Sequence, residues 1–176
     1  MLTDFLSAQR TWVMTKRGSD DLPIGALVDF VINPDSGIFE ALWVQSREGL
    51  RLIALDDILQ WNRNKITIAD ENDLSTPDDF PRVKAVIERE VPILRSKVFC
   101  GKKYIGRVKN FGFDTLSPRI LTLRVHSGFL FWIQERIIPR SKILRIIPEG
   151  IFISENIIPR AEKILEENTV LPEVDS

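Results

Sequence analysis

Apolar residues in the first half of the chain fall in short runs that are typical of β-strands. The run Leu27–Ile32 is followed by the turn sequence Asn33-Pro34-Asp35-Ser36-Gly37 and then by the run Ile38–Val44. Proline presets φ early in such a turn and glycine accepts a positive φ at its end, so the pattern predicts a β-hairpin. Further strands are expected at residues 50–53 and 66–68, separated by the polar step Asp56-Asp57.

Three other stretches have a different character. Residues 70–81 are rich in Asp, Ser, Thr and Pro, a composition that predicts a linker. The stretch Phe80–Glu90 is expected to hold a short helix that ends before Pro92, after which strands resume. Helix formers follow a proline in Pro159–Glu167, so residues 157–176 are expected to form a C-terminal helix and a frayed tail.

The sequence contains an internal repeat. With a shift of 81 residues, Ile24–Phe30 falls on Ile105–Phe111, which aligns Gly25 with Gly106. A second hairpin is expected to turn near Arg47-Glu48-Gly49. Four residues of slack around it change the shift to 85, and 66–68 then falls on 151–153. The sequence therefore predicts an all-β protein of two similar units, at residues 1–75 and 95–156, joined by a linker with a short helix at 76–94.

Each unit follows one pattern: a glycine that opens a strand, a hairpin turn, a strand rich in Leu and Val, a short step and a closing Ile-x-Ile strand. The first copy matches it at Gly25, Asp35-Ser36-Gly37, Leu42-Trp43-Val44, Asp56-Asp57-Ile58 and Ile66-Thr67-Ile68. The second keeps Gly106, Leu123, Val125, Ile143 and Ile151-Phe152-Ile153. It departs at Pro118, which replaces Gly37, and at Ser141-Lys142, which replaces Asp56-Asp57. This pattern resembles the PRC-barrel family.

The resemblance implies two tandem small β-barrels of about six strands each. The family includes the cytoplasmic domain of the photosynthetic reaction-centre H subunit and the C-terminal domain of the ribosome maturation factor RimM. Known members bind other macromolecules and catalyse no reaction. The resemblance thus implies a non-catalytic adaptor or assembly factor, associated with a photosynthetic or other membrane complex. The similarity to RimM implies the alternative, a factor associated with the ribosome or RNA.

The residue inventory gives little support to catalysis or metal binding. Cys100 and His126 are the only residues of their types, so neither a disulfide within the chain nor a Cys/His zinc or catalytic set is expected. Asp56-Asp57 is interpreted as a turn or cap. The acidic run at 70–73 lacks the central Gly and terminal Glu of a calcium loop and is interpreted as solvated linker. We expect no enzyme activity, cofactor, metal or small-molecule substrate.

Hydropathy and charge set the expected location and partners. The sequence shows no apolar run long enough to cross a bilayer and no secretory signal, which predicts a cytoplasmic protein, free or peripheral at a membrane surface. The net charge is only −1, but residues 1–80 carry 7 Lys and Arg against 14 Asp and Glu, whereas residues 91–153 carry 12 against 3. The candidate partner-binding residues are Arg107, Lys109, Arg119, Arg124, Phe129, Phe131 and Trp132.

Three interpretations of this asymmetry stay open. The acidic and basic halves could face each other, within one chain or in a homodimer. The basic half could instead bind a protein partner or membrane head groups. Basic residues interleaved with aromatic ones could also bind RNA by phosphate pairing and base stacking.

Overall fold

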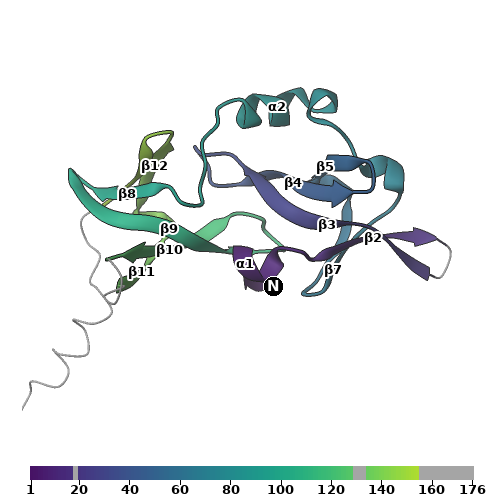
Figure 1. Ribbon diagram of the computed structural model, residues 1–176, viewed down its shortest axis with the longest axis horizontal. Helices are drawn as coiled ribbons and strands as arrows, with labels where there is room; N and C mark the ends of the chain where they lie inside the picture. Colours follow the sequence, from purple (N-terminus) through teal and green to yellow (C-terminus); the bar gives the residue numbers. More distant parts are fainter. Residues whose placement is uncertain (18–19, 129–133, 155–176) are drawn as a thin grey trace, which may run out of the picture.

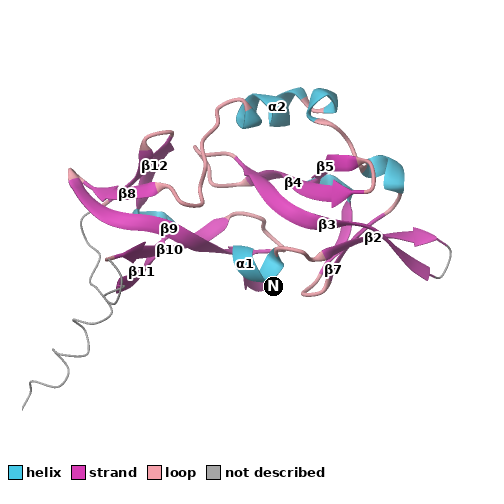
Figure 2. Ribbon diagram, in the orientation of Figure 1, coloured by secondary structure: helices cyan, strands magenta, loops and turns pink. Residues whose placement is uncertain are grey.

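The computed structural model describes residues 1–17, 20–128 and 134–154, and most of them lie in two β-sheets placed side by side (Figures 1 and 2). The first sheet has the strand order β5-β4-β3-β2-β7-β6. Its strands are β2 (Trp12–Arg17), β3 (Asp20–Ile32), β4 (Phe39–Ser46), β5 (Gly49–Ala54), β6 (Ile58–Trp61) and β7 (Lys65–Ile68).

The second sheet has the order β11-β10-β9-β8-β13-β12, with β1 added alongside β9. Its strands are β1 (Leu2–Asp4), β8 (Lys97–Cys100), β9 (Lys103–Asp114), β10 (Ile120–Ser127), β11 (Gln134–Pro139), β12 (Ile143–Ile147) and β13 (Gly150–Ile153). The helical elements are short: α1 (Phe5–Ala8), α2 (Pro81–Ile87) and the 3₁₀ turns η1 (Leu55–Asp57), η2 (Glu71–Asp73), η3 (Pro77–Asp79) and η4 (Arg140–Lys142).

The two sheets share one topology, and the likeness extends to the pairing register. The parallel pair is β2–β7 in the first sheet and β8–β13 in the second, and all other registered pairs are antiparallel. Val13 pairs with Gly25 and Val98 pairs with Gly106, in both cases next to a β-bulge. Gly25 and Gly106 differ by the 81-residue offset found in the sequence, and Val13 and Val98 differ by 85 residues, so the two sheets repeat the same pairing.

The sequence predicts two closed barrels, but in the part of the chain that the structure describes neither sheet closes through hydrogen bonds between its end strands. Within the described residues, the end strands of the first sheet, β5 and β6, each pair with one neighbour and not with each other. The same holds for β11 and β12 in the second sheet. A mostly β fold with two sheets is confirmed, whereas the C-terminal helix expected at 157–176 lies outside the described residues.

The N-terminal strand belongs to the second sheet, although sequence reasoning placed residues 1–75 together in the first unit. β1 pairs antiparallel with β9, with Thr3 opposite Phe113. The cause is the burial of Phe5, which is 1% exposed and whose ring lies 5.2 Å from that of Phe111 and 5.5 Å from that of Phe30. Three strand residues are too few to show an alternating pattern, so this pairing could not be predicted from the sequence.

The two sheets bury one shared hydrophobic core. A single cluster of buried side chains includes Phe30 and Phe39 from the first sheet and Phe111 and Phe113 from the second. The ring centroids of Phe30 and Phe113 are 5.1 Å apart, and those of Phe39 and Phe113 are also 5.1 Å apart. The units are therefore not two barrels with separate cores.

A short antiparallel bridge also joins the sheets near an approximate two-fold axis. Ile38 pairs with Arg119, its own equivalent at the 81-residue offset. The Phe39 N–H donates to the Pro118 carbonyl, and the Ile120 N–H donates to the Gly37 carbonyl, both at 2.9 Å. Each hydrogen bond is the repeat equivalent of the other, so the sheets meet symmetrically.

Helix α2 covers the outer face of the first sheet, the face turned away from the shared core (Figure 1). Proline at its first turn favours the helix start. Val83 lies in a second, smaller apolar cluster with Val31, Ala41 and Leu52, which come from three adjacent strands. The helix expected within Phe80–Glu90 is thus present and serves as a cover for the sheet.

The close approach of strands at Gly106 gives a stability prediction. Gly106 has φ of +149°, and a Cβ there would lie 2.3 Å from the His126 carbonyl oxygen. Gly106→Ala should lower the free energy of unfolding by about 3 kcal/mol, because it adds backbone strain and a clash with main chain. The melting temperature, measured by circular dichroism, should fall by roughly 6–12 °C.

Gly49→Ala is the matched control. Gly49 also has positive φ, +108°, but a Cβ there would have no atom within 4 Å. This variant isolates the backbone cost, about 1 kcal/mol. Equal losses in the two variants would contradict the close-approach explanation.

Candidate binding surface

The second sheet presents an outer face whose side chains follow from strand alternation. Val98, Val108 and Ile151 point into the shared core and are 0% exposed. Their neighbours along the strands therefore point outward. We call this outward side of β8, β9, β10, β12 and β13 the basic-aromatic face, because of the residues it carries.

Three aromatic side chains form a row across this face. Phe152 on β13 is in register with Phe99 on β8, which in turn is in register with Tyr104 on β9. The ring centroids of Phe99 and Phe152 are 5.4 Å apart in a stacked arrangement, and those of Phe99 and Tyr104 are 5.9 Å apart, edge to face. The Arg145 guanidinium lies 4.2 Å from the centroid of Phe152, and Tyr104 is 51% exposed. Such a row combines apolar area with a cation that stacks on it.

Basic residues lie beside the aromatic row. Lys97 on β8 pairs in register with Arg107 on β9, and Arg107 pairs with His126 on β10. The Arg107 guanidinium donates to the Arg95 carbonyl at 3.0 Å, which helps to fix its direction. The His126 Nε2 and the Glu135 Oε2 are 2.8 Å apart, so a carboxylate lies next to the histidine, on the β10 side of Arg107.

The structure brings together three of the candidate partner-binding residues and places a fourth, Arg119, away from them. Arg107, Lys109 and Arg124 are all exposed on β9 and β10, with Lys109 at a β-bulge beside Arg124. Arg119 lies instead at the bridge between the sheets. Phe129, Phe131 and Trp132, the predicted aromatic part of the site, lie outside the described residues.

Sequence reasoning missed the aromatic residues that the structure does place on this face. Phe99, Tyr104 and Phe152 come from three separate strands, and their adjacency depends on the parallel pairing of β8 with β13. A signal was present in the alternation Val98-Phe99 and Ile151-Phe152-Ile153, which puts the aromatic residue opposite to the buried aliphatic ones. That alternation shows on which face of its own strand each aromatic residue lies, but not which residues of other strands lie beside it.

The acidic first half uses basic partners other than the second sheet for several of its ion pairs. Asp21 pairs with Lys65 and Glu48 pairs with Arg51, both within the first sheet. Residues of the linker supply three more partners: Arg82 for Glu40, Lys84 for Asp78 and Arg89 for Asp35. Within the chain, the halves meet through aromatic rings rather than through these carboxylates.

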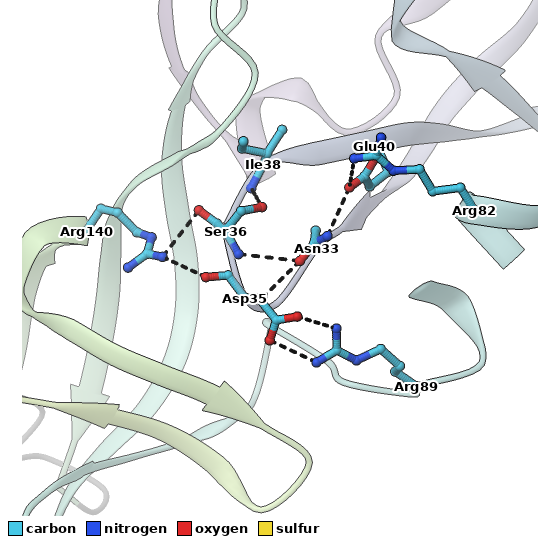
Figure 3. A network of polar contacts seen from close by, with 8 residues as sticks. All are labelled: Asn33, Asp35, Ser36, Ile38, Glu40, Arg82, Arg89 and Arg140. Atoms are coloured by element: carbon cyan, nitrogen blue, oxygen red, sulfur yellow. Dashed lines mark hydrogen bonds and ion pairs between the residues drawn. The ribbon is translucent and has the colours of Figure 1, made fainter. Parts of the chain in front are cut away.

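One polar network does join the repeats, at the tip of the hairpin formed by β3 and β4 (Figure 3). Arg140 of η4 donates to the carbonyl oxygens of Asp35 and Ser36 at 3.3 and 3.2 Å, and to the Ile143 carbonyl at 3.1 Å. Arg89 makes two hydrogen bonds to the Asp35 carboxylate, at 2.7 and 3.0 Å, and lowers the pKa of that carboxyl. The hairpin is thereby held by a cation on each side.

The acidic motifs act in local turns. Asp56 and Asp57 form η1, and burial together with the nearby Asp73 and Asp56 raises the pKa of Asp57. The Asp70 carboxylate accepts from the Asn72 N–H and the Asp73 carboxylate accepts from the Asp70 N–H, which makes a capping box around η2. Among the described residues, no group of three or more His, Cys, Asp or Glu side chains is placed to hold a metal ion.

Comparison of the sequence with models of known protein families, and with curated proteins, found no match. No helix within the described part of the chain has the length and apolar content that a membrane crossing requires.

The Arg140 network generates a stability prediction. Arg140→Ala should lower the free energy of unfolding by about 2 kcal/mol, because it removes charge-assisted hydrogen bonds to the partly buried Ile143 carbonyl and to the exposed carbonyls of Asp35 and Ser36. Arg140→Lys should recover less than half of this loss, since an ammonium group cannot reproduce the planar fork. Urea unfolding followed by tryptophan fluorescence measures both variants.

Arg89→Ala is the control on the other side of the hairpin. Its ion pair with Asp35 is solvent-exposed, so this variant should leave the urea midpoint nearly unchanged. A loss for Arg89→Ala as large as that for Arg140→Ala would show that hairpin charge, and not the link between repeats, sets the stability.

Proposed function

We propose that the chain is a non-catalytic adaptor or assembly factor of the PRC-barrel type, and that it binds an acidic surface of a partner protein through the basic-aromatic face. The observation that carries the proposal is the row Phe152, Phe99 and Tyr104 flanked by Arg145, Lys97 and Arg107. Tyr, Phe and Arg are the residue types enriched where protein interfaces are strongest.

The repeat architecture supports the PRC-type assignment. Both units place the pattern glycine next to a β-bulge in its own strand, at Gly25 on β3 and Gly106 on β9. Both also place a 3₁₀ turn before the closing pair of strands, η1 in the first unit and η4 in the second. The family analogy extends the partner to a photosynthetic or other membrane-bound complex, on whose surface the protein would be peripheral.

A second candidate function is a RimM-like association with the ribosome or RNA. The observation that favours it is the closeness of exposed Arg and Lys side chains to stacked aromatic rings, an arrangement that can hold phosphates and bases together. The same face would be used, so the two candidates differ in the partner and not in the site.

Charge reversal on the face tests the first candidate. The triple variant Arg107→Glu, Lys109→Glu, Arg124→Glu should lose at least about tenfold of the partner recovered in a pull-down from native lysate at moderate salt, because opposite charges would become like charges. The readout is quantitative mass spectrometry of the captured proteins, and circular dichroism checks that the variant is folded.

The variant Lys16→Glu, Arg47→Glu, Arg63→Glu is the matched control, since it makes the same charge change at exposed positions of the first half. It should retain the partner. If wild type recovers no stable partner, or if both triple variants lose it equally, the proposed face is wrong.

Sedimentation on ribosomal subunits separates the second candidate from the first. A ribosome- or RNA-binding factor should co-sediment in a salt-dependent manner, and Arg107→Glu with Lys109→Glu should release it. Nuclease treatment of the lysate should also remove the captured partner. If the chain co-sediments with ribosomal subunits, and both added salt and nuclease abolish this association, the second candidate replaces the first.

A further inference from the structure

The longest strand of each repeat is β3 in the first sheet and β9 in the second. In the second sheet, a short strand lies along the C-terminal end of β9. β1 pairs with β9 over Gly112–Asp114, on the edge of β9 that lies beyond β8. Asn110, just before this segment, accepts from the Leu6 N–H at 3.3 Å and donates to the Asp4 carboxylate at 2.8 Å. A strand of three residues is thus held by backbone pairing, by the Asn110 side chain, which both accepts and donates, and by the ion pair between the Met1 ammonium and Asp114 at 2.6 Å.

The equivalent edge of the first sheet has no such strand. The 81-residue offset places Val31–Asn33 at the position of Gly112–Asp114 and Asp29 at that of Asn110. Among the described residues, β2 pairs with β3 only as far as Ala26, and no strand pairs with β3 beyond it on this edge. Residues 87–89, which correspond in sequence to β1, are instead the end of α2 and the turn after it.

A groove of about 440 Å³ lies along this edge. Its lining includes Val31, Ile32 and Trp43 from the first sheet and Ile87, Glu90 and Pro92 from the segment that leaves α2. We call it the β3 groove. At the 85-residue offset, residues 90–93 correspond in sequence to α1, and these residues also line the groove.

The groove differs from its sister site in charge. Asp29 accepts a hydrogen bond from the Phe30 N–H at 2.8 Å, as Asn110 does from the Phe111 N–H at 2.9 Å. An ionised carboxylate cannot donate as the Asn110 amide does, and Glu90 adds a second carboxyl to the lining. Desolvation raises the pKa of the Asp29 carboxyl, although part of the residue is exposed, so a cation beside it would be favoured.

We propose that the β3 groove binds an extended peptide of a partner protein, which adds a strand to β3 at Val31–Ile32 and places a Lys or Arg side chain next to Asp29 and Glu90. The geometry is strand addition, in which main-chain hydrogen bonds supply affinity and side-chain pockets supply selectivity. The inference rests on the proposed function as a binding protein, but it concerns a different surface from the basic-aromatic face and a partner segment of opposite charge.

The sister strand supplies the probe. An acetylated, amidated peptide with the sequence of residues 1–4, changed by Asp4→Lys and flanked by Gly-Ser on each side, should bind with a dissociation constant on the order of 1 mM. Titration into the ¹⁵N-labelled full chain should move the backbone amide signals of Val31 and Ile32. The same peptide with Thr3→Pro, which removes a strand N–H, should move them at least about fivefold less.

Charge variants of the protein complete the test. Asp29→Arg should weaken binding of the lysine peptide at least about tenfold, whereas Glu149→Arg, at an exposed turn of the second sheet, should leave it unchanged. The proposal is overturned if 2 mM peptide (about twice the expected dissociation constant) moves no β3 amide. It is also overturned if the shifts occur only along β9, where the peptide would be exchanging with β1.

The two proposals fail in different ways. If the lysine peptide does not bind but the pull-down still recovers a partner that depends on Arg107, Lys109 and Arg124, the groove is wrong and the adaptor function stands. If the peptide binds as expected but no partner depends on those three residues, the basic-aromatic face is wrong while the groove stands.

Discussion

The contact between the inner faces of the two sheets is what the rest of the structure depends on. Each sheet has only about six strands and leaves one apolar face to be covered, and an open sheet of this size cannot bury that face by itself. The Phe30, Phe39 and Phe113 rings lie at the centre, with centroids 4.7–5.1 Å apart. Aromatic contacts of this kind each add about 0.5–1.5 kcal/mol beyond the area they bury. The two repeats therefore share one hydrophobic core.

This dependence accounts for what the sequence could and could not predict. The strands and the hairpin at 33–37 followed from local alternation and turn chemistry, which are carried by nearby residues, and the repeat offsets followed from self-similarity of the sequence. The pairing of β1 with β9, by contrast, joins residues more than one hundred positions apart and is decided by the burial of Phe5. The shared core was missed for the same reason, because a strand pattern shows that a face is apolar but not which face covers it.

The candidate site was predicted in the same uneven way. The excess of Lys and Arg in residues 91–153 identified Arg107, Lys109 and Arg124, because charge can be counted without knowledge of the fold. The aromatic row could not be counted, since Phe99 and Phe152 become neighbours only through a parallel strand pair that connects residues 53 positions apart. Parallel pairing leaves no turn signature between its partners, so sequence alone does not register it.

Divergence between the repeats explains why the two outer faces differ. On the first sheet, Val31, Ala41 and Leu52 form an apolar patch that α2 covers, with Trp43 at its margin. At the equivalent positions the second sheet has Gly112, Thr122, Ile137 and Arg124, and Ile137 is 45% exposed. A glycine, a threonine and an arginine cannot form the apolar patch that holds a helix like α2, so this face can keep its charges accessible. The two repeats thus share one core, whereas, within the described residues, the outer face of the second repeat carries exposed charged residues without a helix over it.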